Sequence, residues 1–214
     1  MFVDRGDAGR RLGRRLRHLR GADVVVVGLP RGGVPVAAEV AVALGAALDV
    51  IVVRKLGLPG QPELAVGAIG EGDVRVLVPE TVWRAGVAEA ELARVERRER
   101  AELHRRARLF RGERTRISLA GRTAVVVDDG IATGSTARAA CQVARSQGAA
   151  RVVLAVPVAP FDGALGLRDV ADELIAVATP RLLRAIGGWY HDFSQTTDEE
   201  VIACLRGAGA GLSG

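Results

Sequence analysis

Runs of β-branched residues that alternate with helix-forming stretches constrain the fold of this chain more than any other sequence feature. Four consecutive valines, Val24–Val27, are typical of a strand that is covered on both faces. Similar runs recur at Thr123–Val127 and Arg151–Val156, with helical patterns between them. This alternation predicts an α/β domain with a doubly wound, mostly parallel sheet.

Spacing and chain breakers predict the remaining elements. Helices are expected over Arg5–Arg20, Pro35–Leu44, Pro79–Phe110, Ser135–Gln147, Asp162–Val170 and Thr197–Leu205, the last capped by Thr197 or Asp198. Further strands are expected at Asp49–Val53 and Leu174–Val177, and Leu64–Ile69 with Val74–Val78 should form a hairpin beside the parallel sheet. Two glycines and two prolines make Leu56–Glu63 an expected exposed loop, of the kind that closes over a site.

Length and composition favour a single domain over residues 1–214, with a frayed tail at 207–214. The two cysteines, Cys141 and Cys204, are too few for a disulfide framework. The charged N-terminus lacks the apolar core of a secretory signal, and the longest apolar stretch, 36–53, is interrupted by charges. We therefore expect a cytoplasmic protein without a membrane partner.

Positive charge is almost entirely carried by arginine. The formal net charge is +5, and Lys55 is the one lysine among 30 basic residues. An ammonium and a guanidinium differ in shape and hydration, so the placement of Lys55 indicates either a specific role or chance. The arginines of the first predicted helix are expected mostly on a solvated face. The basic run at 97–108 is interleaved with glutamates, which favours a solvated, ion-paired face over a nucleic-acid surface.

The segment 125–136, VVVDDGIATGST, is the strongest functional signal. A buried strand ends in Asp128 and Asp129, and a loop of small and hydroxyl residues then opens a helix. Backbone N–H groups at a helix N-terminus bind phosphate, and carboxylates accept hydrogen bonds from vicinal hydroxyls. The pattern predicts a site for a phosphorylated sugar. It is not a Walker A loop, because the required spacing and lysine are absent.

This segment resembles the signature of the type I phosphoribosyltransferase family. The resemblance extends to the glycine turn after the first valine run, where Arg31, Gly32 and Gly33 correspond to the pyrophosphate loop. It also includes Arg54 and Lys55, which are similar to the basic pair before the flexible loop of adenine-type members. The three motifs cover roughly residues 20–160. Two departures, at Gly130 and Ser135, mark a divergent subgroup.

The resemblance implies a transferase that uses phosphoribosyl pyrophosphate. The 5-phosphate is expected at Ala132, Thr133, Gly134, Ser135 and Thr136; the pyrophosphate at Arg31, Gly32, Gly33, Arg54 and Lys55. Asp128 and Asp129 should bind the ribose hydroxyls and, through substrate or water, the Mg²⁺ that accompanies the substrate. Together with Lys55 they are the expected catalytic residues. Catalysis would consist of positioning and electrostatic stabilisation of an oxocarbenium-like ribosyl group.

The acceptor is the least determined part of this interpretation. A small C-terminal hood over about 180–206 should cover a nitrogenous acceptor such as a purine or pyrimidine base. Trp189 and Tyr190 are candidates for stacking on that base, and an apolar plug is the alternative interpretation of the same aromatics. A homodimer is included among the expected assemblies, as is partnership with another enzyme domain.

An alternative function is that of a regulator that binds the same ligand but does not catalyse its reaction. In it the chain senses phosphoribosyl pyrophosphate and binds RNA or DNA through basic helices such as Arg5–Arg20. The balancing glutamates and the complete set of loops favour the enzyme, so a nucleic-acid partner is not expected.

Overall fold

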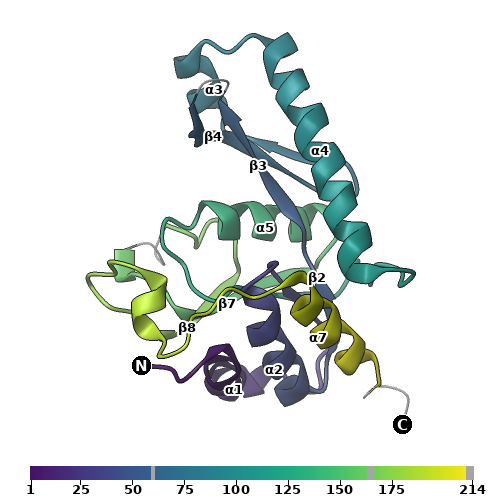
Figure 1. The fold of residues 1–214 in the computed structure, drawn as a ribbon, viewed down its shortest axis with the longest axis vertical. Helices are drawn as coiled ribbons and strands as arrows, with labels where there is room; N and C mark the ends of the chain where they lie inside the picture. The colour runs from purple at the N-terminus through teal and green to yellow at the C-terminus, as the bar shows by residue number, and fades with distance from the viewer. Residues whose placement is uncertain (59–60, 163–165, 211–214) are drawn as a thin grey trace.

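The computed structural model describes residues 1–58, 61–162 and 166–210 and confirms the α/β class (Figure 1). Its centre is a parallel sheet in the order β2-β1-β6-β7-β8. The strands are β1 (Val24–Gly28), β2 (Ala47–Val50), β6 (Thr123–Val127), β7 (Arg151–Val158) and β8 (Glu173–Ala178). Every residue of β1 is buried, as expected of a valine run covered on both faces.

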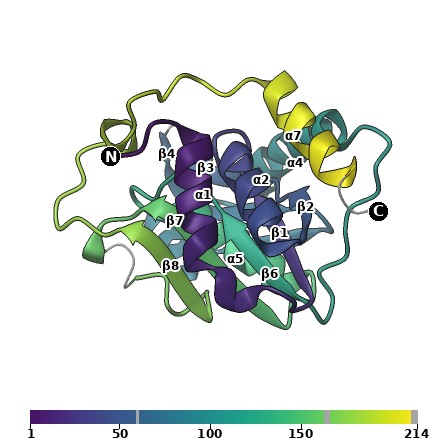
Figure 2. The same cartoon turned by 90° about the horizontal axis from the view of Figure 1, so that it is seen from below.

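Helices cover both faces of this sheet. Figures 1 and 2 place α1 (Arg5–Arg15), α2 (Gly33–Leu44) and α7 (Asp198–Ala210) on one side and α5 (Ser135–Ser146) on the other. The turn η1 (Arg17–Leu19) continues α1, so the predicted helix Arg5–Arg20 is present with a tighter last turn. Its leucines at 12, 16 and 19 are all buried, because they share the face that packs on the core.

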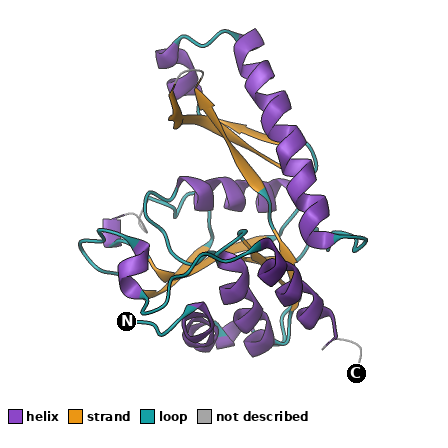
Figure 3. Cartoon of the chain, in the orientation of Figure 1, coloured by secondary structure: helices purple, strands orange, loops and turns teal. Residues whose placement is uncertain are grey.

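A second, antiparallel sheet stands above α5, as Figure 3 shows. It consists of β3 (Val53–Leu58), β4 (Gln61–Gly70) and β5 (Val74–Leu77), with α3 (Pro79–Ala85) and the long α4 (Glu89–Arg111) packed along it. The hairpin predicted beside the parallel sheet forms, but that placement is wrong. At its base the second sheet contacts α5 directly, and a Cβ on Gly70 would lie 2.4 Å from Val143 Cγ2.

The prediction of an exposed loop over Leu56–Glu63 is also wrong. Residues 56–58 end β3 and residues 61–63 begin β4, while 59–60 lie outside the described residues. The register between β3 and β4 shifts on both sides of Gly57, so a bulge absorbs the glycine without ending the strand. Leu56 is fully buried, and this packing outweighs the local preference for a loop.

Three other boundaries differ from the sequence prediction. The strand expected at Asp49–Val53 ends at Val50, and Val53 already begins β3. The helix over Pro79–Phe110 is interrupted at Gly86, which ends α3 with a left-handed φ of 59°. Residues 166–170 form turns instead of the end of helix Asp162–Val170, whose residues 163–165 lie outside the described chain.

The C-terminal segment connects the two ends of the molecule. After β8 it passes through η2 (Ile186–Trp189), beside the N-terminus, and continues to α7 (Figure 2). Thr197 caps α7 as predicted, since its Oγ1 accepts a hydrogen bond from the Glu200 N–H at 3.2 Å. The assignment of a hood to 180–206 stays a prediction. Within the described chain no helix is both long enough and apolar enough to cross a membrane.

A buried ion-pair network joins the second sheet to the first. At the end of α4, Arg111 donates from Nε to Asp49 Oδ1 of β2 at 2.7 Å and from Nη2 to the Val50 carbonyl at 2.8 Å. Arg111 also pairs with Glu71 in the turn between β4 and β5. Asp49 Oδ2 accepts from the Ile117 N–H at 2.9 Å. Each charged group is therefore satisfied within the protein.

Removing one member of this network should destabilise the fold strongly. Arg111→Met leaves Asp49 buried without its ion pair, so we expect the free energy of unfolding to fall by about 3–5 kcal/mol. Urea denaturation of Arg111→Met and of the control Arg108→Met, which changes an exposed arginine on the same helix, measures the difference. Equal stability of the two variants would contradict this role.

Candidate active site

The site lies where the carboxyl ends of β1 and β6 meet. The strands pair in parallel register, with Gly28 opposite Val127, so the loops that follow them leave the sheet at the same edge. The Leu29 N–H donates to the Val127 carbonyl at 2.8 Å, which continues the pairing into the loops. The predicted pyrophosphate loop and the predicted acidic pair are thus brought together.

The two loops touch at glycines. A Cβ on Gly33 would lie 2.7 Å from the Val127 carbonyl oxygen and 2.8 Å from Asp128 Cα. A Cβ on Gly32 would lie 2.0 Å from Asp129 Oδ2. The backbone contact leaves no room for a side chain and requires glycine at position 33, whereas a side chain at position 32 would have to displace the Asp129 carboxylate.

A cavity of about 180 Å³ opens at the N-terminus of α5. Four of the five residues predicted for the phosphate loop line it, Ser135 being the exception. Both acidic residues also line it. The full lining comprises Asp128, Asp129, Gly130, Ile131, Ala132, Thr133, Gly134, Thr136, Ala137 and Ile186. The first N–H groups of a helix carry partial positive charge, so the cavity can accept an anion.

Ile186 is a member of this site that the sequence analysis missed. It comes from η2, more than fifty residues after the acidic pair, and its Cγ2 would lie 2.6 Å from a Cβ on Gly130. The isoleucine therefore occupies the space that a side chain at position 130 would need. This gives a physical reason for the departure at Gly130, and no local signal in the sequence could have linked the two residues.

The carboxylates of the acidic pair each keep one oxygen unbound by protein. Asp128 Oδ1 accepts from the Asp129 N–H at 2.9 Å, and Asp129 Oδ2 accepts from Arg5 Nε at 2.9 Å. Within the described residues, Asp128 Oδ2 and Asp129 Oδ1 accept no hydrogen bond from the protein, and neither oxygen atom is fully buried. Two open carboxylate oxygens beside a cavity can accept from two adjacent hydroxyls.

Burial and mutual repulsion act on the acidic pair. Burial, and then the charge of Asp129, raise the pKa of Asp128 well above its ordinary value of 3.8. Burial also raises the pKa of Asp129, although the charge and hydrogen bonds of Arg5 oppose this shift. Ionisation of Asp128 therefore costs more free energy in the folded protein than in the unfolded chain.

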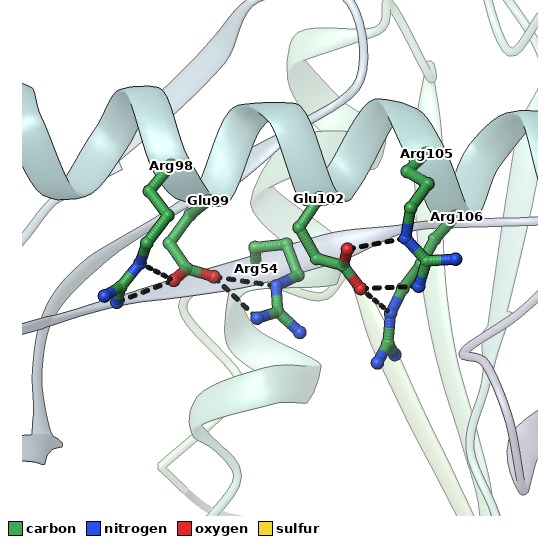
Figure 4. Close-up of polar contacts among 6 residues, drawn as sticks. All are labelled: Arg54, Arg98, Glu99, Glu102, Arg105 and Arg106. Carbon is green, nitrogen blue, oxygen red and sulfur yellow. Dashed lines mark hydrogen bonds and ion pairs between the residues drawn. The ribbon is translucent and has the colours of Figure 1, made fainter.

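The predicted pyrophosphate ligands are distributed over three elements. Arg31 lies in the loop before α2, with Nη1 3.8 Å from Asp198 Oδ1 at the start of α7. Arg54 and Lys55 lie on β3 and do not line the cavity. Arg54 donates from Nε and Nη2 to Glu99 Oε2 at 2.9 and 2.6 Å, as Figure 4 shows. Lys55 follows on the opposite face of the strand and is exposed.

Trp189 and Tyr190 do not line the cavity either. Tyr190 is buried and donates its hydroxyl to the Asp129 carbonyl at 2.6 Å. Its ring lies 5.3 Å from that of Phe2 and 5.0 Å from that of Phe193, centroid to centroid. For Tyr190 these contacts match the apolar plug, which was the alternative interpretation of these aromatics.

The sequence model of the phosphoribosyl transferase domain matches residues 7–180. The chain belongs to this family. Over 205 residues the chain is 58% identical to the protein named "Putative phosphoribosyl transferase Rv0571c" from Mycobacterium tuberculosis, an alignment that covers 96% of this chain and 46% of that protein. The same figures hold for the protein named MT0597 from another strain of that species. The chain therefore spans about half the length of the curated relatives it matches.

A solved structure shares both the fold and much of the sequence. The chain superimposes on the crystal structure of TT1426 from Thermus thermophilus with a TM-score of 0.85 and 45% sequence identity. The match covers 95% of this chain and 97% of the other. At this coverage the likeness includes more than the parallel sheet.

Neutralising Asp128 should stabilise the phosphoribosyl transferase domain at neutral pH. The pKa of Asp128 is raised in the folded state, so the folded protein resists the ionisation that the unfolded chain undergoes above pH 3.8. Asp128→Asn removes this cost. We expect a higher free energy of unfolding than wild type at pH 7, with the difference shrinking as the pH falls toward 3.8. Urea titrations between pH 4 and 8 measure this difference in the free energy of unfolding. A variant that is less stable than wild type at pH 7 would contradict a raised pKa of Asp128 in the folded protein.

Proposed function

We propose that the chain binds phosphoribosyl pyrophosphate and transfers ribose 5-phosphate to a nitrogenous base, with release of pyrophosphate. The observation that carries this proposal is the cavity at the N-terminus of α5 with two open carboxylate oxygens beside it. A phosphate and a vicinal diol on one molecule match these two features together. Family membership supports the same reaction class.

In the proposed reaction the bond between the anomeric carbon and the pyrophosphate oxygen breaks, and the electron pair leaves with pyrophosphate. A ring nitrogen of the acceptor forms the new bond to that carbon, and its proton passes to the released pyrophosphate or to water. The residues at 132–136 hold the 5-phosphate, and Asp128 and Asp129 hold the ribose hydroxyls. The leaving group faces the loop at Arg31, Gly32 and Gly33. Lys55 would reach it from β3, and so would Arg54 once it exchanges its ion pair with Glu99 for the anion. These roles position the substrate and stabilise charge.

Mg²⁺ is expected to accompany this substrate, and the site offers two carboxylates as ligands for it. Mg²⁺ is commonly held by one or two carboxylates together with substrate phosphates and water. Asp128 and Asp129 offer oxygens of this kind, whereas no group of three or more metal-binding side chains occurs in the described part of the chain. The ion would therefore arrive with the substrate and neutralise the departing pyrophosphate.

Turnover should depend on both acidic residues. Asp128→Asn with Asp129→Asn keeps the size of the side chains but weakens two charged hydrogen bonds to the diol, which predicts a loss of roughly 10²–10⁴-fold. The measurement is pyrophosphate release from phosphoribosyl pyrophosphate and Mg²⁺ across a panel of purine and pyrimidine bases. Asp23→Asn with Asp73→Asn, whose side chains are 70% and 90% exposed, is the matched control.

Two outcomes would contradict the proposal. Wild-type activity in the Asp128 and Asp129 variant would remove the diol assignment. Silence of the wild-type protein across the whole panel, combined with RNA binding that weakens steeply with salt, would favour the sensing regulator instead. That rival draws on arginines 14, 15, 17 and 20, which are exposed on α1, on η1 and just after η1.

A further inference from the structure

The first helix places a guanidinium against the acidic pair. Arg5 is the first residue of α1, and both its Nε and its Nη2 lie 2.9 Å from Asp129 Oδ2. The two side chains are only 12% and 14% exposed. The arginines of this helix were expected mostly on a solvated face, and Arg5 is an exception.

The position of Arg5 is unfavourable for the helix itself. The N-terminus of a helix carries partial positive charge and favours acidic residues, such as Asp4 and Asp7 here. A cation at this end opposes the helix dipole. The ion pair with Asp129 offsets that cost, which indicates that Arg5 serves the site and not the helix.

A second set of contacts fixes the other side of the guanidinium. Arg5 Nη1 donates to the Ser194 carbonyl at 2.7 Å, and the guanidinium carbon lies 4.1 Å above the centre of the Phe193 ring. Phe193 in turn packs on Tyr190, whose hydroxyl binds the backbone of Asp129. The C-terminal segment therefore holds Arg5 in one orientation.

The geometry leaves a defined part of Asp129 open. Both Arg5 contacts go to Oδ2, which also faces Gly32, so Oδ1 is the oxygen left for a ligand. The positive charge also offsets the repulsion that two neighbouring carboxylates would exert on a phosphorylated ligand. An unheld Asp129 could turn about its side-chain bonds and lose this alignment.

We propose that Arg5 is a positioning residue for sugar recognition, which fixes Asp129 so that Oδ1 accepts a hydrogen bond from a ribose hydroxyl. The inference rests on the proposed function, since it concerns the same ligand. It adds a residue from outside the three motifs, and it gives the N-terminal helix and the C-terminal segment a shared role in binding the diol.

The test separates the diol from the phosphate. Dissociation constants of ribose 5-phosphate and of inorganic phosphate are measured by calorimetry for the full chain. Arg5→Gln should weaken the binding of ribose 5-phosphate about tenfold, which is the effect of one charged hydrogen bond. The dissociation constant of inorganic phosphate should stay within about twofold of the wild-type value. Inorganic phosphate needs only the loop at α5, so a general loss of structure would weaken both ligands and not one.

Further variants keep the test decisive. Arg10→Gln, on the same helix and with its side chain 54% exposed, should change neither constant. Arg5→Lys retains the charge but not the two-donor geometry, so its affinity for ribose 5-phosphate should fall between those of wild type and Arg5→Gln. If Arg5→Gln does not fold, Phe193→Leu removes the stacking surface and should weaken ribose 5-phosphate selectively, to a smaller extent.

The outcomes distinguish this inference from the function on which it rests. Wild-type protein that binds neither ligand, or binds both equally, would overturn the proposed function and the inference together. If wild-type protein binds ribose 5-phosphate more tightly than inorganic phosphate, and Arg5→Gln shows the same difference in affinity, only the role of Arg5 would be overturned.

Discussion

Parallel pairing of β1 with β6 is the constraint on which the rest of the site depends. It sends two loops, about one hundred residues apart in sequence, out of the same edge of the sheet. The contact between the glycine loop and the acidic pair then follows: the backbone at Val127 and Asp128 leaves no space for a side chain at position 33, and the Asp129 carboxylate occupies the space beside Gly32. The N-terminus of α5 completes the site, since its helix starts directly after the second loop.

The sequence predicted those parts of the site that are encoded in continuous segments. The valine run of β1, the strand Thr123–Val127 and the helix after Gly134 each carry their own local signal. What could not be predicted depends on long-range contacts. Ile186 fills the space above Gly130, and Arg5 reaches Asp129 across 124 positions of sequence.

The second sheet shows the same limit at the level of the fold. Glycine and proline near position 60 indicate a loop, yet β3 and β4 continue to Leu58 and from Gln61 because Leu56 packs in the core below α4. Arg111 then ties this layer to β2 through Asp49. Neither the packing nor the ion pair has a signature in the local sequence, and both determine where Arg54 and Lys55 stand.

Charge at the edge of the site is arranged around α7. Asp198 faces Arg31 of the glycine loop. The hydrogen bond and charge of Glu102, with the charge of Asp198, raise the pKa of Arg105 on α4. The first turn of α7 therefore contacts the predicted pyrophosphate loop directly, through the ion pair of Asp198 with Arg31. In the proposed function, an anion at Arg31 would meet a guanidinium that already has an acidic partner, so its binding would involve exchange of partners.

The most direct test of this account is a crystal structure of the protein with ribose 5-phosphate bound. The account predicts the phosphate at the N-terminus of α5, within hydrogen-bond distance of the backbone between Ala132 and Thr136, and the two ring hydroxyls on Asp128 and Asp129. A ligand bound elsewhere, or a cavity that stays closed to the sugar at saturating concentration, would contradict it.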